Sequence, residues 1–350
     1  MNSLPNIKSL TKTELKEFFV SHNEKPFRAN QVYEWLWKKN ATSFDEMSNL
    51  PTQTRSLLTQ NFNLHKVQIS ETQISSDKTI KNAFQLFDGK ITEGVLIPSK
   101  TRMTACISSQ VGCSLSCSFC ATGKLERLRN IEPDEIFDQV ALIKKQAEEI
   151  YKTPLTNIVY MGMGEPLLNY SNVLRSIELI TSSEGLGMSP KRITVSTAGI
   201  AKMIKKLGDD QVKFNLALSL HAATDEQRNK IMPINETNSL DTLGEALQYF
   251  FEKTGTRITF EYIIFKDFND SLQDARNLAK FCKQVPCKIN IIEYNPIDDA
   301  QFSKADSQKT EEFAKFLEEK CKLIVNIRRS RGKDIDAACG QLANKNKAVH

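Results

Sequence analysis

Beyond residue 100 the sequence alternates between short apolar runs and longer amphipathic runs, and this alternation strongly constrains the fold. Seven runs are strand-like: TRMTACISS, TNIVYMG, KRITVST, KFNLALSLH, RITFEYIIF, CKINIIEYN and KLIVNIR. Helix-like segments separate them and cover about 133–151, 170–181, 200–207, 241–253, 271–283 and 308–320. Strands that alternate with helices pair in parallel, because each helix returns the chain to the starting edge of the sheet. The pattern therefore predicts an α/β fold.

The number of units narrows the architecture. Six β/α units in about 230 residues are too few for an eight-unit barrel, and no G-x-G-x-x-G motif follows the first strand as in dinucleotide-binding folds. We expect a partial, open (β/α)6 barrel over residues 99–331. Its clearest helix opens at Pro133. The predicted apolar stripe of that helix comprises Ile136, Val140, Ile143, Ala147 and Ile150.

Residues 1–75 are predicted to form a small helical accessory domain. Thr11 and Glu14 have the spacing of a capping box in front of an apolar-periodic segment, and further helices are expected at about 28–39 and after Pro51. Trp35 and Trp37 lie in the second of these segments and are interpreted first as part of the core of this domain. An RNA-binding surface is the alternative, because four basic residues flank the aromatics: Lys25, Arg28, Lys38 and Lys39.

Residues 76–98 are predicted to form a β-hairpin that connects this domain to the barrel. The runs KNAFQLF and ITEGVLIP flank Asp88-Gly89, which is a hairpin signal. Alternation in the second run places Glu93 on the apolar face that Ile91 and Val95 share. A carboxylate on that face is either an edge-strand charge or a partly desolvated base.

The composition favours a cytoplasmic protein that keeps its eight cysteines as thiols. Apolar residues make up 40% and charged residues 25%, as in globular domains. No run of eighteen apolar residues occurs, and the sequence MNSLPNIKSLTKTELK lacks the apolar run of a signal peptide. In a reducing compartment a close group of cysteines is expected to bind metal or to react. The net charge of +5 permits a polyanionic partner without identifying one.

The run CSLSCSFC places Cys113, Cys117 and Cys120 in a C-x3-C-x2-C arrangement directly after the first barrel strand. Three thiolates can bind three irons of a cubane cluster and leave the fourth iron open to another ligand. A zinc ion with a distant fourth ligand is one alternative, and three unligated cysteines are another. The chemistry of α/β barrels occurs where this run lies, at the carboxyl ends of the strands.

Further polar residues are expected at the same ends of neighbouring strands. A rim of such residues would suit a small polar cofactor beside the cysteines. They are Gly164, Glu165, Ser196, Ser219, His221 and Asn295.

The sequence resembles known families over nearly its whole length. The C-x3-C-x2-C run resembles the signature of radical S-adenosylmethionine (SAM) enzymes. Together with CSFCATG, MGMGEPLLN, ITVSTAGI, SLHA, MPIN, EYNP and DIDAACGQL, it is similar to the bacterial dual-specificity RNA adenine-C2 methyltransferases. The resemblance includes FRANQVYEWLW and SFDEMSNLP of the helical domain. A C8-specific 23S rRNA methyltransferase that confers antibiotic resistance shares the cysteines and is the alternative. The run PLLN and the helical domain favour the C2 enzyme. A non-catalytic zinc or iron–sulfur RNA-binding protein is the remote alternative.

The resemblance implies a set of cofactor-binding residues. Cys113, Cys117 and Cys120 would hold a [4Fe-4S] cluster, and two SAM molecules would be used per turnover. SAM would be bound by Gly164, Glu165, Ser196, Ser219, Leu220, His221 and Asn295.

The resemblance also implies three catalytic residues. Cys339, in a C-terminal tail over 332–350, would carry a methyl group, which a deoxyadenosyl radical would activate for addition to adenine C2. Cys106 would resolve the resulting protein–RNA adduct through a transient disulfide with Cys339, and Glu93 would accept the C2 proton. Strand alternation places Cys106 on the more polar face of its strand, as expected of a reactive thiol. Cys282, Cys287 and Cys321 have apolar neighbours and are interpreted as structural.

The implied partners are 23S rRNA at the peptidyl-transferase centre, tRNA at the adenine 3′ of the anticodon, and a flavodoxin or ferredoxin-type reductant. A monomer is expected. Two basic runs are candidate phosphate contacts. One, at 188–208, contains Lys191, Arg192, Lys202, Lys205 and Lys206, and the other contains Arg328, Arg329, Arg331 and Lys333.

Overall fold

The computed structural model describes residues 4–298 and 301–344, so the end of the predicted tail, 345–350, lies outside the described residues. Its main feature is a ten-stranded sheet in the order β1-β2-β3-β4-β7-β8-β9-β10-β11-β12. The strands are β1 Gln68–Ile74, β2 Ile80–Gln85, β3 Ile91–Pro98, β4 Met103–Ile107, β7 Asn157–Tyr160, β8 Ile193–Thr197, β9 Asn215–Ser219, β10 Ile258–Ile264, β11 Cys287–Glu293 and β12 Val325–Arg328. A separate short ribbon pairs β5 Gln110–Val111 with β6 Arg129–Asn130.

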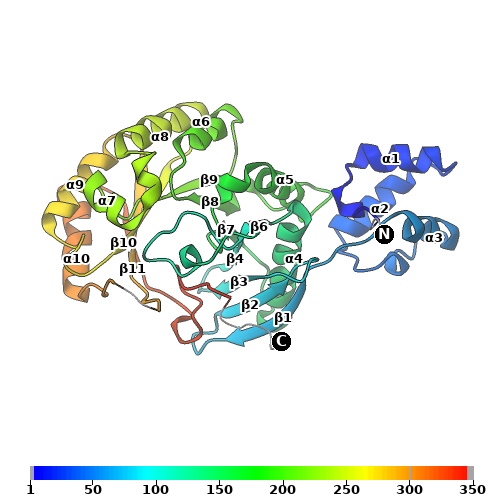
Figure 1. Cartoon of the computed structure of the whole chain (residues 1–350), viewed down its shortest axis with the longest axis horizontal. Coiled ribbons are helices and arrows are strands. Elements are labelled where there is room, and N and C mark those ends of the chain that lie inside the picture. Colours follow the sequence, from blue (N-terminus) through cyan, green and yellow to red (C-terminus); the bar gives the residue numbers. More distant parts are fainter. Residues whose placement is uncertain (1–3, 299–300, 345–350) are drawn as a thin grey trace.

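The strands from β4 to β12 pair in parallel and form the predicted barrel. Helices connect them around the outside of the curved sheet (Figure 1). They are α4 Pro133–Tyr151, α5 Tyr170–Thr181, α6 Ala201–Asp209, α7 Asp225–Ile231, α8 Leu240–Thr254, α9 Leu272–Cys282 and α10 Ser307–Lys315. Because β1 and β12 lie at opposite edges and do not pair, the sheet stays open. The prediction of a partial barrel is confirmed, with β12 as a further strand after the sixth crossover.

Helix α4 shows how the sequence directs these elements. Its first four predicted stripe residues, Ile136 to Ala147, are fully buried, and Pro133 occupies its first turn. Ile150, in the last turn of the helix, is instead 48% exposed, so the prediction that it continues the buried stripe is wrong. None of the described helices is long and apolar enough to span a membrane.

The antiparallel strands β1–β3 extend the sheet at one edge. The predicted hairpin is present: Leu86 donates its N–H to Lys90, and Gly89 takes a positive φ of 80° in the turn between them. Strand β1 lies inside the range 1–75 that was predicted to be helical, and that expectation is wrong for 68–74. This edge strand is mostly exposed, so it lacks the apolar alternation by which a half-buried strand is recognised.

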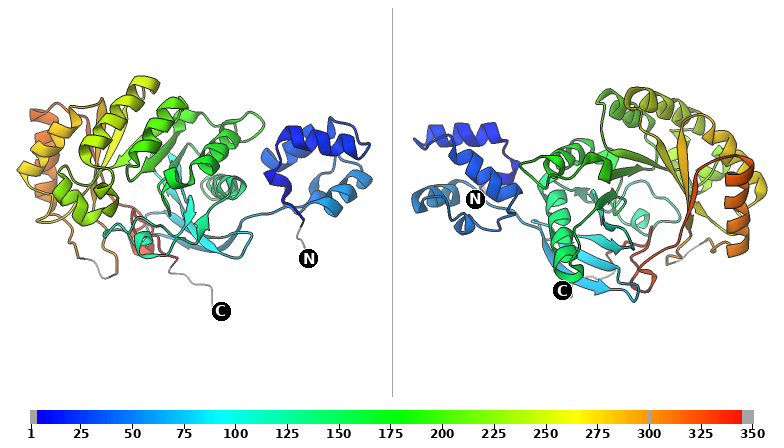
Figure 2. Two further views of the ribbon diagram at one scale, coloured as in Figure 1. Left: turned by 45° about the horizontal axis from the view of Figure 1, so that its top comes forward. Right: turned by 180° about the vertical axis from the view of Figure 1, so that it is seen from behind.

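The N-terminal helices, α1 Lys12–Ser21, α2 Arg28–Trp37 and α3 Thr52–Asn61, form a separate lobe beside the barrel (Figure 2). Lys8 is buried between the two parts and donates to both carboxylate oxygens of Asp138 on α4, at 2.7 and 2.8 Å. Trp37 packs edge-on against Phe137 of the same helix. Trp37 is therefore a core residue, as first interpreted, whereas Trp35 is half-buried and lies beneath the ammonium group of Lys39.

Candidate active site

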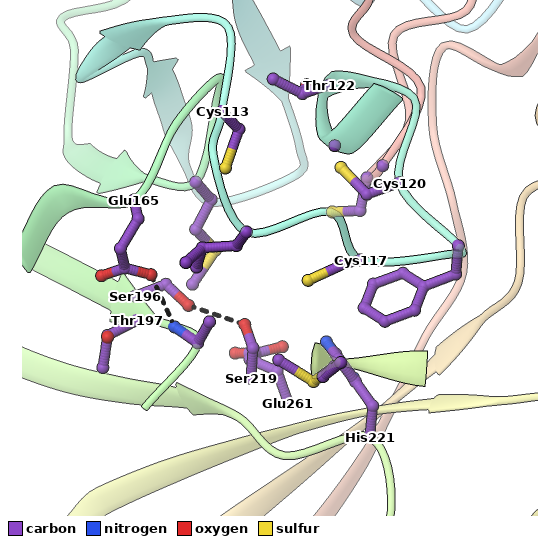
Figure 3. Close-up of a pocket in the computed structure, with 18 of the residues that line it drawn as sticks. Cys113, Cys117, Cys120, Thr122, Glu165, Ser196, Thr197, Ser219, His221 and Glu261 are labelled. Atoms are coloured by element: carbon purple, nitrogen blue, oxygen red, sulfur yellow. Dashed lines mark hydrogen bonds between the residues drawn. The ribbon is translucent and has the colours of Figure 1, made fainter. Parts of the chain in front are cut away.

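A cavity of about 150 Å³ opens at the carboxyl ends of the parallel strands, and the three cysteines of the CSLSCSFC loop project into it (Figure 3). It is also lined by predicted residues from several strand ends: Gly164, Glu165, Ser196, Ser219 and His221. The structure therefore brings together five of the seven residues predicted to bind SAM beside all three predicted cluster ligands. Residues far apart in sequence meet here because parallel strands end on the same side of the sheet.

The cysteine loop is held in a tight, irregular path by close backbone contacts. A Cβ at Gly112, which has a φ of +78°, would lie 1.9 Å from the carbonyl oxygen of Glu126. A Cβ at Gly123 would lie 2.9 Å from the carbonyl oxygen of Cys117. Only glycine fits at the first of these positions, and it is strongly favoured at the second. These contacts fold the loop back on itself so that all three thiols face one cavity.

The chemistry of the donor set suits an iron–sulfur cluster. Burial raises the pKa of Cys113 to about 11 and raises the pKa values of Cys117 and Cys120 as well, so these thiols need a cation to become thiolates. No three Cys, His, Asp or Glu side chains in the described parts of the chain converge closely enough to hold one metal ion. A cubane distributes three thiolates over three iron atoms and does not require such convergence. The residues present therefore fit a cluster.

Glu165 lies buried at the end of β7 with its carboxylate held by the backbone. Its two oxygens accept the N–H groups of Ala198, at 2.7 Å, and Leu167, at 2.9 Å. Burial raises its pKa, while these hydrogen bonds oppose the increase. The preceding residue must be glycine, because Gly164 has a φ of +94° and a Cβ there would lie 2.4 Å from the side chain of Gln110.

The ends of β8 and β9 add hydroxyl groups and a neutral imidazole to the lining, with Ser196 next to Glu165 (Figure 3). The hydroxyl oxygens of Ser196 and Ser219 are 3.4 Å apart. Burial, followed by the charge of Arg228, lowers the pKa of His221 to about 3. The Nδ1 atom of His221 accepts the N–H of Ile263, so the proton of the neutral ring lies on Nε2. The carboxyl group of Glu261 also lines this part of the cavity beside Ser219 (Figure 3), and burial raises its pKa.

Two residues predicted to bind SAM occupy supporting positions instead of lining the cavity. Leu220 is fully buried, its N–H donates to the carbonyl of Glu261, and its own carbonyl accepts from Arg228. Asn295 donates from Nδ2 to the carbonyl oxygen of Cys339 at 3.4 Å. Neither side chain is part of the described lining of the cavity.

Arg228 on α7 is a buried residue of this site that sequence reasoning missed. Its guanidinium group is fully buried and donates to the carbonyls of Ala198, Ser219 and Leu220 and to the side chain of Asn235. Burial lowers its pKa to about 10, and Cys117 and Asp225 oppose that shift. Arg228 thus ties the ends of β8 and β9 together beneath the cysteine loop. An arginine in a short helix without an apolar stripe gives no signal of burial in the sequence.

A second cavity, of about 350 Å³, adjoins the first and contains Cys106 and Cys339. Burial raises the pKa of Cys106 to about 12, and the neighbouring thiol of Cys339 adds to this effect. Cys339 is exposed, yet the atoms packed around its thiol raise its pKa, and the guanidinium of Arg328 lowers it. Cys339 and Gly340 line both cavities, so this segment forms part of the wall between them.

Backbone hydrogen bonds hold the C-terminal segment against the cysteine loop. Ala121 donates its N–H to the carbonyl of Gly340 at 2.7 Å, and the hydroxyl of Thr122 donates to the carbonyl of Leu342 at 2.6 Å. The position of Cys339 is therefore coupled to that of the loop that carries Cys117 and Cys120.

Glu93 lies under the same C-terminal segment and lines neither cavity among the described residues. It is buried, and one of its oxygens is 3.3 Å from the ammonium nitrogen of Lys81. Another accepts the N–H groups of Ala343 and Asn344 at 2.8 and 3.0 Å. Of the two interpretations of Glu93, an exposed edge-strand charge is excluded by this burial. The structure does not bring Glu93 into the space beside Cys106 and Cys339.

The cysteines interpreted as structural and the basic side chains of the first basic run lie away from the two cavities. Cys282 and Cys287 lie where α9 leads into β11, at the end of the barrel opposite the cavities, and the thiol of Cys287 contacts the Cys282 carbonyl at 3.6 Å. Lys191 and Arg192 precede β8 at that same opposite end, and α6 carries the other lysines of the run 188–208 on the outer surface. None of the basic residues named in that run lines the described cavities, and its role as a candidate phosphate contact stays a prediction.

Comparisons with known proteins agree with this organisation. A family model described as "Ribosomal RNA large subunit methyltransferase N-terminal domain" matches residues 5–64, and one described as "Radical SAM superfamily" matches residues 107–281. A radical SAM methyltransferase from Sphaerobacter thermophilus superposes with a TM-score of 0.91 at 35% identity and covers 97% of this chain and 99% of that one. The hydrogenase maturase HydG, at 12% identity and a TM-score of 0.51 over 68% of this chain and 55% of that one, shares the fold alone.

Similarity to curated proteins extends over nearly the whole chain. The chain is 64% identical to the probable dual-specificity RNA methyltransferase RlmN of Cytophaga hutchinsonii, over 97% of this chain and 93% of the relative. It is 40% identical to the dual-specificity RNA methyltransferase RlmN of Campylobacter concisus, over 98% and 92% of the two chains. On this similarity, the chain belongs to the dual-specificity RNA methyltransferases of the radical SAM superfamily.

Proposed function

We propose that this enzyme methylates C2 of an adenine in 23S rRNA and in tRNA, with Cys339 as the residue that carries the methyl group. The observation that carries the proposal is the shared wall, because Cys339 borders both the cavity of the cluster cysteines and the second cavity. A thiol in this position can meet a cofactor on one side and an RNA base on the other. Such a base must be unpaired or flipped, since C2 is inaccessible in a stacked pair.

The first cavity would hold the cofactors. Cys113, Cys117 and Cys120 would bind a [4Fe-4S] cluster, and Gly164, Glu165, Ser196, Ser219 and His221 would surround one SAM at a time. When bound, these groups supply a methyl group from one SAM molecule and a deoxyadenosyl radical from a second. C2 of adenine is electron-poor, so a radical route is needed for carbon transfer there. The neutral state of His221 leaves its Nε2–H as a donor toward the cavity.

Cys106 would release the product from the protein. Attack of its thiolate on the sulfur of Cys339 breaks the bond between that sulfur and the transferred carbon. The electron pair stays on the carbon, which takes up a proton to become the methyl group. A Cys106–Cys339 disulfide remains, and its reduction to two thiols in the cytoplasm takes two protons and two electrons, which an external donor such as a flavodoxin or ferredoxin-type reductant would deliver one at a time. The charge of Arg328, which lowers the pKa of the Cys106 thiol against the effect of burial, supports this role.

Glu93 would accept the C2 proton only after the C-terminal segment shifts. Its carboxylate is covered by the N–H groups of Ala343 and Asn344, which lie a few residues beyond Cys339. Movement of Cys339 toward RNA would therefore also release these two hydrogen bonds. This connection supports a role for Glu93 at a stage of turnover when the C-terminal segment no longer covers its carboxylate.

The decisive experiment is mass spectrometry of RNA treated with anaerobically reconstituted enzyme, SAM and reductant. The proposal expects a methyl group on C2 of one adenine in each RNA. Methylation at C8 would contradict the C2 assignment, and zinc binding without SAM cleavage would contradict the enzyme class. Cys106→Ala should accumulate RNA covalently bound through Cys339, whereas Cys282→Ala, at the opposite end of the barrel, should not. A Cys106→Ala protein that carries methyl-Cys339 but no RNA adduct would contradict the assigned roles.

A further inference from the structure

The cavity that contains Cys106 and Cys339 has an unusual charge composition. Four of its lining residues are arginines, and among the described residues no carboxylate lines it. The arginines are Arg102, Arg328, Arg329 and Arg331. A cavity of about 350 Å³ with this lining is large enough for a small anionic ligand and attracts negative charge.

Two of these arginines are already compensated by carboxylates outside the lining. Arg328 donates to Glu261, which is buried and also accepts from Asn290. Arg329 lies 3.9 Å from Glu293 and 3.8 Å from Glu311. Because Glu293 also pairs with Lys333 and Lys304, its charge is shared among three cations. Arg328 is thus held as part of the wall, and Arg329 is only weakly neutralised.

The other two arginines, Arg102 and Arg331, have no carboxylate within ion-pair distance in the part of the chain that the structure describes. Arg331 donates to the carbonyl oxygen of Asp77, and Arg102 follows a turn closed by Ser99. Both residues are exposed, and they reach the cavity from two distant segments: Arg102 directly precedes β4, whereas Arg331 follows β12. Two uncompensated guanidinium groups therefore line the same cavity as the two cysteines.

We propose that Arg102 and Arg331 bind the phosphates on the two sides of the target adenosine and thereby direct its base toward Cys339. A guanidinium group matches the planar, bidentate geometry of a phosphate better than an ammonium group does. Phosphate contacts position a nucleic acid without reading its sequence, which suits an enzyme that accepts two different RNAs. The inference rests on the proposed function and adds the residues that orient its substrate.

The other basic run provides the matched control. Lys191 and Arg192 are exposed and line neither cavity, so their positive charge raises general affinity for RNA without contacting a base beside the two cysteines. Removing two charges there changes the net charge of the protein as much as removing Arg102 and Arg331. A difference between the two double variants therefore measures position and not charge.

The test measures binding of a short RNA hairpin with one unpaired loop adenine to the full-length, cluster-loaded protein over a range of salt concentrations. For R102Q/R331Q we expect weaker binding and a slope of log K against log salt that is smaller by about 1.4, since each phosphate contact on a single strand contributes about 0.7. K191Q/R192Q should lose less affinity. Methylation of Cys339 by SAM without RNA should remain in both variants, because it does not involve RNA.

A modified hairpin tests the contacts themselves. Neutral methylphosphonates in place of the two phosphates beside the adenine should weaken binding to the unchanged protein. They should have no further effect on R102Q/R331Q, because the contacts are already missing. The inference is overturned if the losses of RNA affinity caused by the methylphosphonates and by R102Q/R331Q are additive, or if the two double variants lose equal affinity. In either case, C2 methylation by the unchanged protein would leave the proposed function standing. Absence of RNA binding and methylation in the unchanged protein would overturn both.

Discussion

The two adjoining cavities share a wall but are built by opposite means. The first cavity, called the cluster cavity below, contains the three cluster cysteines. Buried side chains that hydrogen-bond to backbone atoms, such as Glu165 and Arg228, hold its walls in place. The second cavity, called the arginine cavity below, is lined by half-buried Arg328 and by three exposed arginines, of which Arg102 and Arg331 lack carboxylate partners among the described residues. The first arrangement fixes the positions of the lining residues, but any change in the core disturbs it. The second attracts a charged ligand over a distance and tolerates substitution.

Loss of one cluster ligand should distinguish the roles of the two cavities most clearly, because it should affect only the cluster cavity. Cys117→Ala should reduce bound iron to background and abolish SAM cleavage, because the two remaining thiolates hold a cubane poorly. Affinity for the RNA hairpin should stay the same, since Cys117 is not part of the arginine cavity. Iron analysis and RNA titration check both expectations, and Cys282→Ala should retain iron. A parallel loss of iron and RNA affinity would show that the cavities act as one unit.

Removal of the buried guanidinium should produce the largest loss of stability. Arg228→Met leaves three backbone carbonyls at the ends of β8 and β9 without this donor and should lower the free energy of unfolding by about 3 to 5 kcal/mol. Urea unfolding measures the change. Arg192→Met, on an exposed residue at the other end of the barrel, is the control and should have little effect. Similar midpoints for the two variants would contradict the structural role of Arg228.

The cluster cavity should also give the protein a specific dependence on pH. His221 has a pKa of about 3 in the folded state and an ordinary value near 6.5 when unfolded. Between these values the unfolded chain binds one more proton, so this residue makes stability fall by about 1.4 kcal/mol per pH unit as the pH decreases below 6.5. Asn tolerates the positive φ of 56° at this position, and His221→Asn should flatten the slope. Equal slopes for both proteins between pH 6 and 4 would argue against a neutral buried imidazole.

A smaller effect is expected at the shared wall itself. Gly162 borders both cavities, and a Cβ there would lie 2.6 Å from the hydroxyl of Ser108 and 2.7 Å from the carbonyl of Ile107. Gly162→Ala should cost about 1 to 3 kcal/mol, because the strand ends must move apart to accept a methyl group. Thermal unfolding of the cluster-free protein provides the measurement. An unchanged transition would show that the wall is less rigid than the closely spaced atoms indicate.

The sequence predicted the parts of the molecule whose signals are local. The barrel strands are apolar runs, α4 has a Pro at its start and a regular stripe, and the three cluster cysteines lie within eight residues of one another. The positions that require glycine were predicted less well, because a side chain is excluded there by atoms of segments that are distant in the sequence. Gly162 is an example, because a Cβ there would meet the hydroxyl of Ser108 and the carbonyl of Ile107.

Other features could not be predicted because they depend on tertiary contacts and leave no local pattern in the sequence. Strand β1 is exposed at the edge of the sheet, so its side chains follow no apolar alternation. Arg228 has the appearance of a surface residue in a seven-residue helix. The basic runs at 188–208 and 328–333 contain five and four basic residues and no acid, and only the fold shows that the basic residues of the first lie outside the lining of both cavities.

The hydrogen bonds of Ala121 and Thr122 to Gly340 and Leu342 have a consequence for how the protein matures. The segment that they hold follows every strand of the sheet in the chain, so it is synthesised after the barrel is complete. Until then the cysteine loop lacks this wall and is open on the side of the second cavity. A cluster inserted before this segment docks would therefore meet an open loop, whereas one inserted afterwards would have to pass the wall that Cys339 and Gly340 form.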